Sequence, residues 1–146
     1  MRRMIAALAL AAAVALVVAP TSSAAGRATV NTRHGKLGTF LVGPNGMTLY
    51  LFEKDKTSKS TCSGQCATFW PPLLTTGKPK AANRTKSSLL GTTKRSDGKL
   101  QVTYKGHPLY YFVQDKKKGD TKGQDFLGFG AKWYVLAPSG KKIDSD

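Results

Sequence analysis

The 146-residue sequence has few of the side chains that build catalytic or metal centres: two cysteines, two histidines and eight acidic residues. A c-type haem is excluded, because no Cys-x-x-Cys-His motif is present and Cys66 is followed by Ala67. A structural zinc site needs four ligands, and only His34 and His107 could join the cysteines. There is no recognisable nucleophile motif around either histidine and no phosphate-binding Gly-x-x-x-x-Gly-Lys loop. The sequence therefore predicts a protein that is not an enzyme and holds no cofactor.

The apolar run at residues 5–18 is fourteen residues long, short of the roughly 20 that a helix needs to cross a bilayer. It follows Arg2 and Arg3 and precedes a flank of small residues that ends at Ala25. This order is typical of a secretory signal peptide. We expect residues 1–25 to be a signal peptide cleaved near Ala25, leaving 26–146 as one mature domain that is secreted or held in the cell envelope. An uncleaved N-terminal anchor is the alternative.

Acidic residues are outnumbered throughout the mature chain. Residues 1–25 hold two arginines and no acids, so 21 basic and 8 acidic residues remain, a net charge of +13. Seventeen of the 21 are lysines, which lack the planar fork that binds phosphate or carboxylate bidentately. The charge predicts diffuse attraction to an anionic partner, such as a cell-wall polymer or a membrane surface, and a plain well-hydrated surface is the alternative. A nucleic-acid partner is disfavoured by export and by the scarcity of arginine.

An internal repeat organises the mature chain. Residues 50–55 (YLFEKD) recur sixty residues later as 110–115 (YYFVQD), and each copy is followed by one of the two tryptophans. The first repeat spans about residues 36–75 and the second about 88–140. The repeated motif residues are Tyr50, Phe52 and Asp55 in the first copy and Tyr110, Phe112 and Asp115 in the second.

The local signals within each repeat are those of strands and turns. Residues 39–42 and 47–52 flank a Pro-Asn-Gly turn and predict a hairpin. In both motif strands the two faces are apolar, so these strands are expected to be central and covered on both sides. The prediction is an all-β fold, a small single-domain sandwich or barrel-like meander built from two related repeats, with one short helical turn near the cysteines. Further strands are expected at 90–94, 99–104, 107–113 and 133–137, the helical turn at 66–70, and polar loops at 77–86 and 116–123.

The motif tyrosines and aspartates could be read as acid and base groups, but a structural role is favoured. The tyrosines and phenylalanines supply core volume, and each aspartate follows a strand, where its carboxylate can accept N–H groups of the turn.

Cys62 and Cys66 are expected to form a disulfide, because an even pair this close in an exported protein is usually oxidised. Loop-closure entropy gives such a bridge roughly 2 kcal/mol of stabilisation. The alternative is a copper-binding or thiol-redox site. In that case the two thiolates would be joined by His107 and Met47, which occupy equivalent positions in the two repeats and include soft ligands suited to copper.

Several motifs in order carry a family resemblance: the paired Tyr-x-Phe-x-x-Asp, then Trp-Pro-Pro-Leu at 70–73, Ser-Leu-Leu-Gly at 88–91, Gly-Asp at 119–120 and Trp-Tyr-Val at 133–135. Over residues 35–140 the chain resembles a bacterial family of secreted lipoprotein repeats of unknown function. The resemblance implies an extracellular or cell-envelope setting and no established activity. No cysteine stands at the predicted cleavage site, so a lipid anchor is not expected. We therefore expect an exported, non-enzymatic binding or structural domain for an anionic surface partner.

Overall fold

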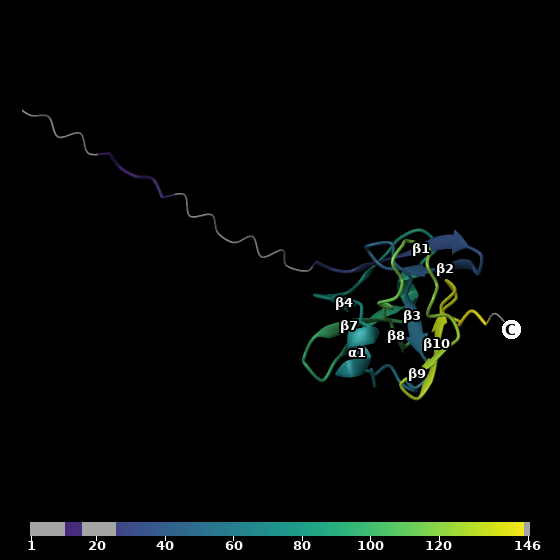
Figure 1. The fold of residues 1–146 in the computed structure, drawn as a ribbon. Coiled ribbons are helices and arrows are strands. Elements are labelled where there is room, and N and C mark those ends of the chain that lie inside the picture. The colour runs from purple at the N-terminus through teal and green to yellow at the C-terminus, as the bar shows by residue number, and fades with distance from the viewer. Residues whose placement is uncertain (1–10, 16–25, 145–146) are drawn as a thin grey trace, which may run out of the picture.

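The computed structural model describes residues 11–15 and 26–144 of the chain (Figure 1). Of the predicted signal peptide, residues 1–10 and 16–25 lie outside the described residues, so its cleavage near Ala25 stays a prediction. Within the described ranges, no helix is both long and apolar enough to span a membrane.

Residues 26–144 form an all-β domain, which confirms the predicted fold class. The strands are β1 (Thr29–Gly35), β2 (Gly38–Val42), β3 (Tyr50–Phe52), β4 (Leu74–Thr75), β5 (Lys80–Ala81), β6 (Leu90–Lys94), β7 (Leu100–Tyr104), β8 (His107–Pro108), β9 (Phe126–Gly128) and β10 (Ala131–Val135). The helices are α1 (Gln65–Phe69) and a 3₁₀-helix, η1 (Ser87–Leu89). Helix α1 is the helical turn predicted near the cysteines. It ends before Trp70 because a residue that precedes a proline disfavours the helical conformation.

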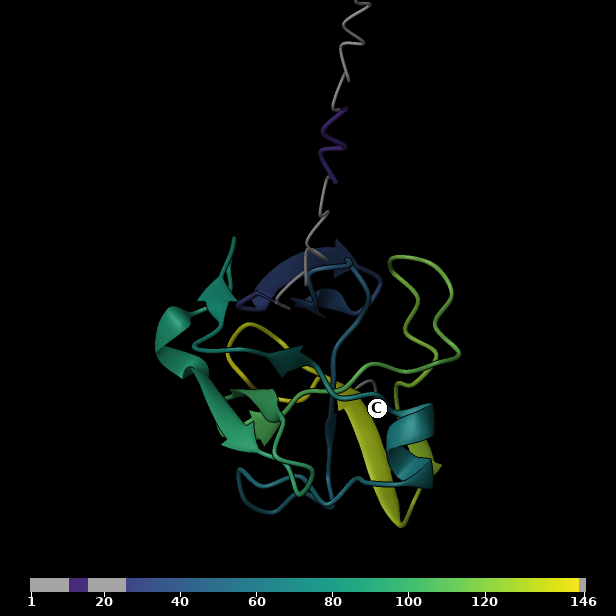
Figure 2. The same ribbon diagram turned by 90° about the vertical axis from the view of Figure 1, so that its left-hand side faces the viewer.

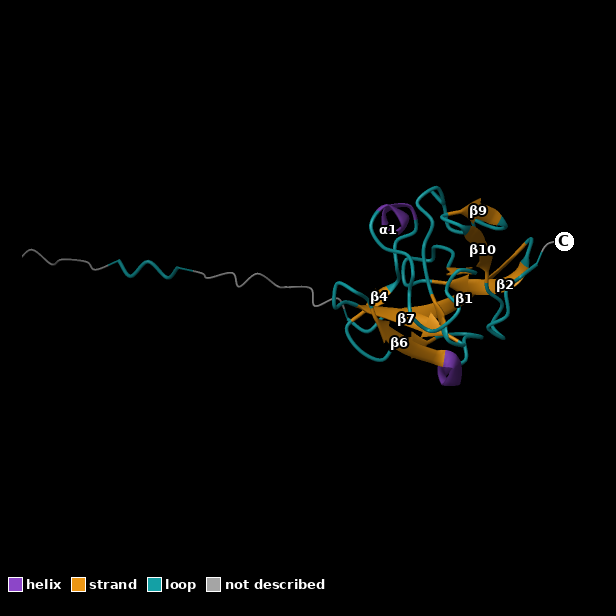
Figure 3. Ribbon diagram, turned by 90° about the horizontal axis from the view of Figure 1, so that it is seen from below, coloured by secondary structure: helices purple, strands orange, loops and turns teal. Residues whose placement is uncertain are grey.

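The strands make three sheets. Their orders are β2-β1-β5, β3-β10-β9 and β4-β7-β6, with β8 also paired to β7. Every pairing is antiparallel except that of β1 with β5. Figures 2 and 3 show α1 and the β6–β7 hairpin on opposite sides of the domain. Each sheet is open at its edges, so the described strands do not close into a barrel.

The two motif segments are shorter as regular strands than the sequence predicts. In the first, Thr48 bridges Val42, but the chain then leaves β2, and Tyr50–Phe52 pairs with β10 instead. In the second, only His107–Pro108 pairs with β7 as β8. Beyond β8 the N–H of Tyr110 donates to Tyr50 and that of Tyr111 donates to Pro71. This segment is therefore hydrogen-bonded to neighbours on both sides, as expected for a central position.

Two hydrophobic clusters cover the two faces of the motif segments, as the alternation of side chains predicts. One cluster contains Leu49, Leu51 and Leu109. The other contains the motif rings together with Trp70 and Trp133. The motif residues are thus the layer between two half-cores, which explains why both of their faces are apolar.

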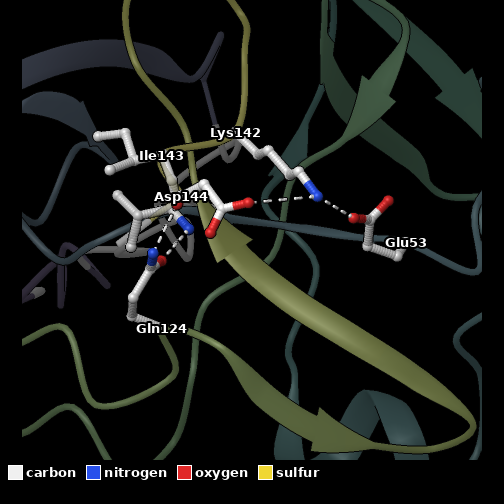
Figure 4. A network of polar contacts seen from close by, with 6 residues as sticks. Glu53, Gln124, Lys142, Ile143 and Asp144 are labelled. Carbon is white, nitrogen blue, oxygen red and sulfur yellow. Dashed lines mark hydrogen bonds and ion pairs between the residues drawn. The ribbon is translucent and has the colours of Figure 1, made fainter. Parts of the chain in front are cut away.

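The end of the second repeat is tied back to the first (Figure 4). Gln124 accepts the N–H of Val135 at 2.9 Å through Oε1 and donates through Nε2 to the carbonyl of Ile143. Lys142 Nζ lies 2.8 Å from Oε1 of Glu53, the residue that directly follows β3. The C-terminal segment therefore closes over β10 and contacts the first motif.

Candidate functional site

The two copies of the motif meet at Tyr50 and Tyr110, whose backbones exchange hydrogen bonds of 2.8 and 3.0 Å. Each hydroxyl then donates to the aspartate of the other repeat. Tyr50 Oη lies 2.6 Å from Asp115 Oδ2, and Tyr110 Oη lies 2.6 Å from Asp55 Oδ2. The second oxygen of each carboxylate accepts a backbone N–H from the following turn, that of Thr61 for Asp55 and that of Lys122 for Asp115. We call these contacts the crossed Tyr–Asp pairs.

The crossed Tyr–Asp pairs are enclosed. Both tyrosines are 0% exposed, and Asp55 and Asp115 are 6% and 7% exposed. Burial raises the pKa of both tyrosines well above the ordinary value of 10, and the neighbouring carboxylates raise it further. Burial also raises the pKa of Asp115, while the Tyr50 hydroxyl opposes that shift by donating to the charged form. A general acid or base must lie within reach of a substrate. The enclosure therefore favours a structural role for all four groups.

The aromatic rings of the two repeats also pair crosswise. Trp70 of the first repeat stacks on Phe112 of the second with ring centroids 4.1 Å apart, and Trp133 stacks on Phe52 at 3.9 Å. The two tryptophans stack on each other at 3.8 Å and 4°. These four rings form one continuous stack, which we call the four-ring stack. Its members come alternately from both repeats, so neither repeat can complete it alone.

A surface hollow brings arginine side chains together. Arg33 on β1 and Arg84 in the loop after β5 line a hollow of about 560 Å³, which we call the arginine hollow. The Arg84 loop is held beside β1 because Ala82 donates to the carbonyl of Val30 at 2.9 Å, and Asn83 donates to the side chain of Asn31. The full lining is Thr32, Arg33, His34, Thr39, Asn83 and Arg84.

The arginine hollow is a shaped feature beside the diffuse charge that the sequence predicts, and the attraction to an anionic partner stays a prediction. Residues 26–146 contain four arginines, and two of them lie in this one hollow. No carboxylate among the described residues lies within 4.0 Å of the side-chain nitrogens of either arginine. Sequence reasoning missed the pair because the two residues are far apart in the chain and follow no spacing rule. The small number of arginines was visible in the sequence, but it does not show which of them meet in the fold.

Residues 31–74 and 91–137 match a protein family described as a secreted repeat of unknown function. Together these segments cover more than half of the chain. The chain belongs to this secreted-repeat family. Each matched segment contains one copy of the motif and one tryptophan, so the two matches coincide with the two repeats of this chain. Comparison with curated proteins and with solved structures gives no significant match.

The cysteines of this secreted-repeat protein form the predicted disulfide. The Cys62 and Cys66 sulfurs are 2.02 Å apart and both residues are buried. Among the described residues, no group of three or more His, Cys, Asp or Glu side chains could share a metal ion. The copper alternative with His107 and Met47 stays a prediction, and it would require both cysteines to be reduced.

His107 gives the secreted-repeat domain a predicted acid sensitivity. It begins β8 and is partly buried, and this burial lowers its pKa from 6.5. At a pH between the folded and the unfolded pKa of His107, the unfolded state binds more protons than the folded state. The stability that neutral His107 allows is therefore fully present above about pH 6.5 and is lost as the pH falls through the folded pKa. We expect the free energy of unfolding in urea to decrease between about pH 7 and pH 5.

The His107→Gln variant should show a smaller decrease over the same pH range. His34→Gln is the matched control, because His34 lies exposed on β1. An equal pH dependence in His107→Gln and the wild type would contradict this assignment.

Proposed function

We propose that this secreted-repeat protein is a non-enzymatic envelope domain that binds an anionic surface polymer through the arginine hollow. The observation that carries the proposal is the convergence of Arg33 and Arg84 on one open hollow, with no carboxylate partner among the described residues. A guanidinium presents a rigid fork that matches phosphate and carboxylate geometry. Two such forks in one hollow suit a polymer with repeated anionic groups better than a single small anion.

The surroundings of the hollow extend its positive charge. A neighbouring hollow of about 400 Å³ shares Arg33 and His34 and adds Lys36. The lysine-rich loop at 116–118 leads into Gly119, where an added Cβ would lie 3.1 Å from Arg33 Nε. This loop therefore runs beside the hollow, and its lysines can attract a polyanion at longer range.

Asp120 is the acidic residue of this neighbouring hollow, and its carboxylate is already engaged. Asp120 Oδ2 accepts the backbone N–H groups of Lys116 and Lys117 at 2.9 and 3.0 Å, and these bonds lower its pKa. The carboxylate thus serves to shape the lysine-rich loop.

The proposal predicts retention on isolated cell wall, or on a defined polyphosphate, that weakens steeply with salt. Arg33→Gln combined with Arg84→Gln is expected to weaken polyphosphate binding at least about tenfold, since hydrogen bonds to charged groups contribute about 1.5–3 kcal/mol each. Dissociation constants at several salt concentrations would measure this loss.

The matched control is Lys54→Gln with Lys132→Gln, which removes the same charge near the β9–β10 end, away from β1 in Figure 1. This control should bind within about threefold of the wild type. Equal losses in the two double variants would mean that the attraction is diffuse and that the hollow is not the site. Release of the wild type from the cell wall at low ionic strength would remove the proposal altogether.

A further inference from the structure

Arg95 is a buried cation without a carboxylate partner. It directly follows β6 and is 9% exposed, whereas Arg33 and Arg84 are exposed. Among the described residues no carboxylate lies within 4.0 Å of its guanidinium. Burying a charge is costly unless the charge is paired, so an unpaired buried arginine calls for an explanation.

The guanidinium of Arg95 is held in place by three neutral oxygens. Nη1 donates to Gln101 Oε1 at 2.7 Å and to Ser60 Oγ at 3.0 Å, and Nη2 donates to the carbonyl of Cys62 at 2.6 Å. Gln101 is itself fixed, because its Nε2 donates to the carbonyl of Leu109 at 2.8 Å. These bonds use three of the five N–H groups that a guanidinium offers. Two N–H groups remain, and no nitrogen of Arg95 is both fully buried and unpartnered.

Arg95 also lines a small polar hollow. Its volume is about 190 Å³, and besides Arg95 it is lined by Ser60, Thr61, Cys62, Ser63 and Ser96. That is room for about six water molecules at roughly 30 Å³ each, or for one small oxyanion with part of its hydration. Ser63 and Ser96 are exposed and carry hydroxyl donors at the rim. We call this the serine hollow.

The carboxylate nearest to Arg95 in the hydrogen-bond network is that of Asp55, which already accepts hydrogen bonds from other groups. Ser60 Oγ lies 2.7 Å from Tyr110 Oη, which donates to Asp55. Asp55 also accepts both the N–H and the hydroxyl of Thr61, at 2.7 and 2.6 Å. Arg95 is therefore separated from this carboxylate by two neutral hydroxyls, and its charge is left to act on the serine hollow.

We propose that the serine hollow is a binding site for a small oxyanion, a carboxylate or phosphate group, recognised by Arg95 with the rim hydroxyls of Ser63 and Ser96. The disulfide between Cys62 and Cys66 fixes the loop that forms one wall. The first repeat supplies the segment 60–63 and the second supplies Arg95 and Ser96, so the site lies where the two repeats meet. It lies apart from the arginine hollow and does not depend on polymer binding there.

The test is an amide-resolved NMR titration of the mature protein with phosphate and, separately, with acetate. Either or both anions should give saturable shifts at residues 61–63 and 96. Ser96→Glu places a competing carboxylate at the rim and is expected to weaken binding at least tenfold. Ser96→Gln has the same size without the charge, and its amide N–H can donate in place of the hydroxyl, so it should bind clearly more tightly than Ser96→Glu. The Arg33→Gln, Arg84→Gln variant should retain these shifts even where it loses the polymer.

Two results would overturn the proposal. The first is the absence of saturable shifts at residues 61–63 and 96 with both anions. The second is equal binding by Ser96→Glu and Ser96→Gln, which would mean that charge in the serine hollow plays no part. Neither result bears on the arginine hollow, because its own test uses different residues and a polymeric ligand.

Discussion

Trp133→Ala is expected to destabilise the domain by about 3–5 kcal/mol, the range for removing a large aromatic ring from a core. Trp133 is 0% exposed, stacks on both Trp70 and Phe52, and donates from Nε1 to the carbonyl of Gly128 at 3.1 Å. Small domains have only about 5–15 kcal/mol of stability in all. The variant should therefore unfold at a much lower urea concentration, as followed by circular dichroism.

Two more conservative variants, Trp133→Phe and Trp70→Phe, separate the contribution of ring packing from that of the indole hydrogen bond. Trp70 Nε1 is buried without a partner, unlike Trp133 Nε1. Trp133→Phe leaves the Gly128 carbonyl without its donor and should cost about 1 kcal/mol more than Trp70→Phe. Leu127→Ala, at a position 71% exposed on β9, is the surface control and should change stability by about 0.5 kcal/mol at most. If Trp133→Ala were as stable as Leu127→Ala, the four-ring stack would not be the centre of the core.

Asp115→Ala is expected to cost about 2–5 kcal/mol, because one buried donor and one partly buried donor lose their acceptor at once. The Tyr50 hydroxyl and the Lys122 N–H both donate to this carboxylate, at 2.6 and 2.9 Å. Asp97→Ala is the control, since Asp97 is exposed and accepts only the N–H of Lys99, at 2.9 Å. Urea denaturation would measure both. A loss no larger in Asp115→Ala than in Asp97→Ala would contradict the role given to the crossed Tyr–Asp pairs.

The sequence predicted the parts of the fold that local pattern controls. Alternation placed Tyr50 and Phe52 on one face and Leu49 and Leu51 on the other, and the two clusters divide in this way. The disulfide and the helical turn beside it also followed from spacing and from Pro71. The repeat itself was visible, and both copies match the secreted-repeat family.

Features that depend on tertiary pairing could not be predicted. Strand β5 is only two residues long and lies in an expected loop, where it is ordered by parallel pairing with β1. The crossed Tyr–Asp pairs were missed for a related reason, since spacing relates Tyr50 to Asp55 of its own repeat. The fold turns these side chains toward the other copy, and the two backbone hydrogen bonds between Tyr50 and Tyr110 bring them together.

These contacts separate the role of the motif from the role of the surface. The motif residues are enclosed in the interior, and each needs a partner from the other repeat. The arginines of the two proposed sites, Arg33, Arg84 and Arg95, lie outside the motif and do not recur at the sixty-residue spacing. The proposed binding functions therefore rest on residues outside the repeated motif.

A double-mutant cycle in urea tests the central claim most directly, namely that the motif joins the two repeats crosswise. Tyr50→Phe and Asp115→Ala, alone and combined, should give a coupling energy of about 1.5–3 kcal/mol, as expected for a hydrogen bond to a charged group. Tyr50→Phe with Asp55→Ala, within one repeat, should be additive to within about 0.5 kcal/mol. A larger coupling within the repeat than across the repeats would contradict the account.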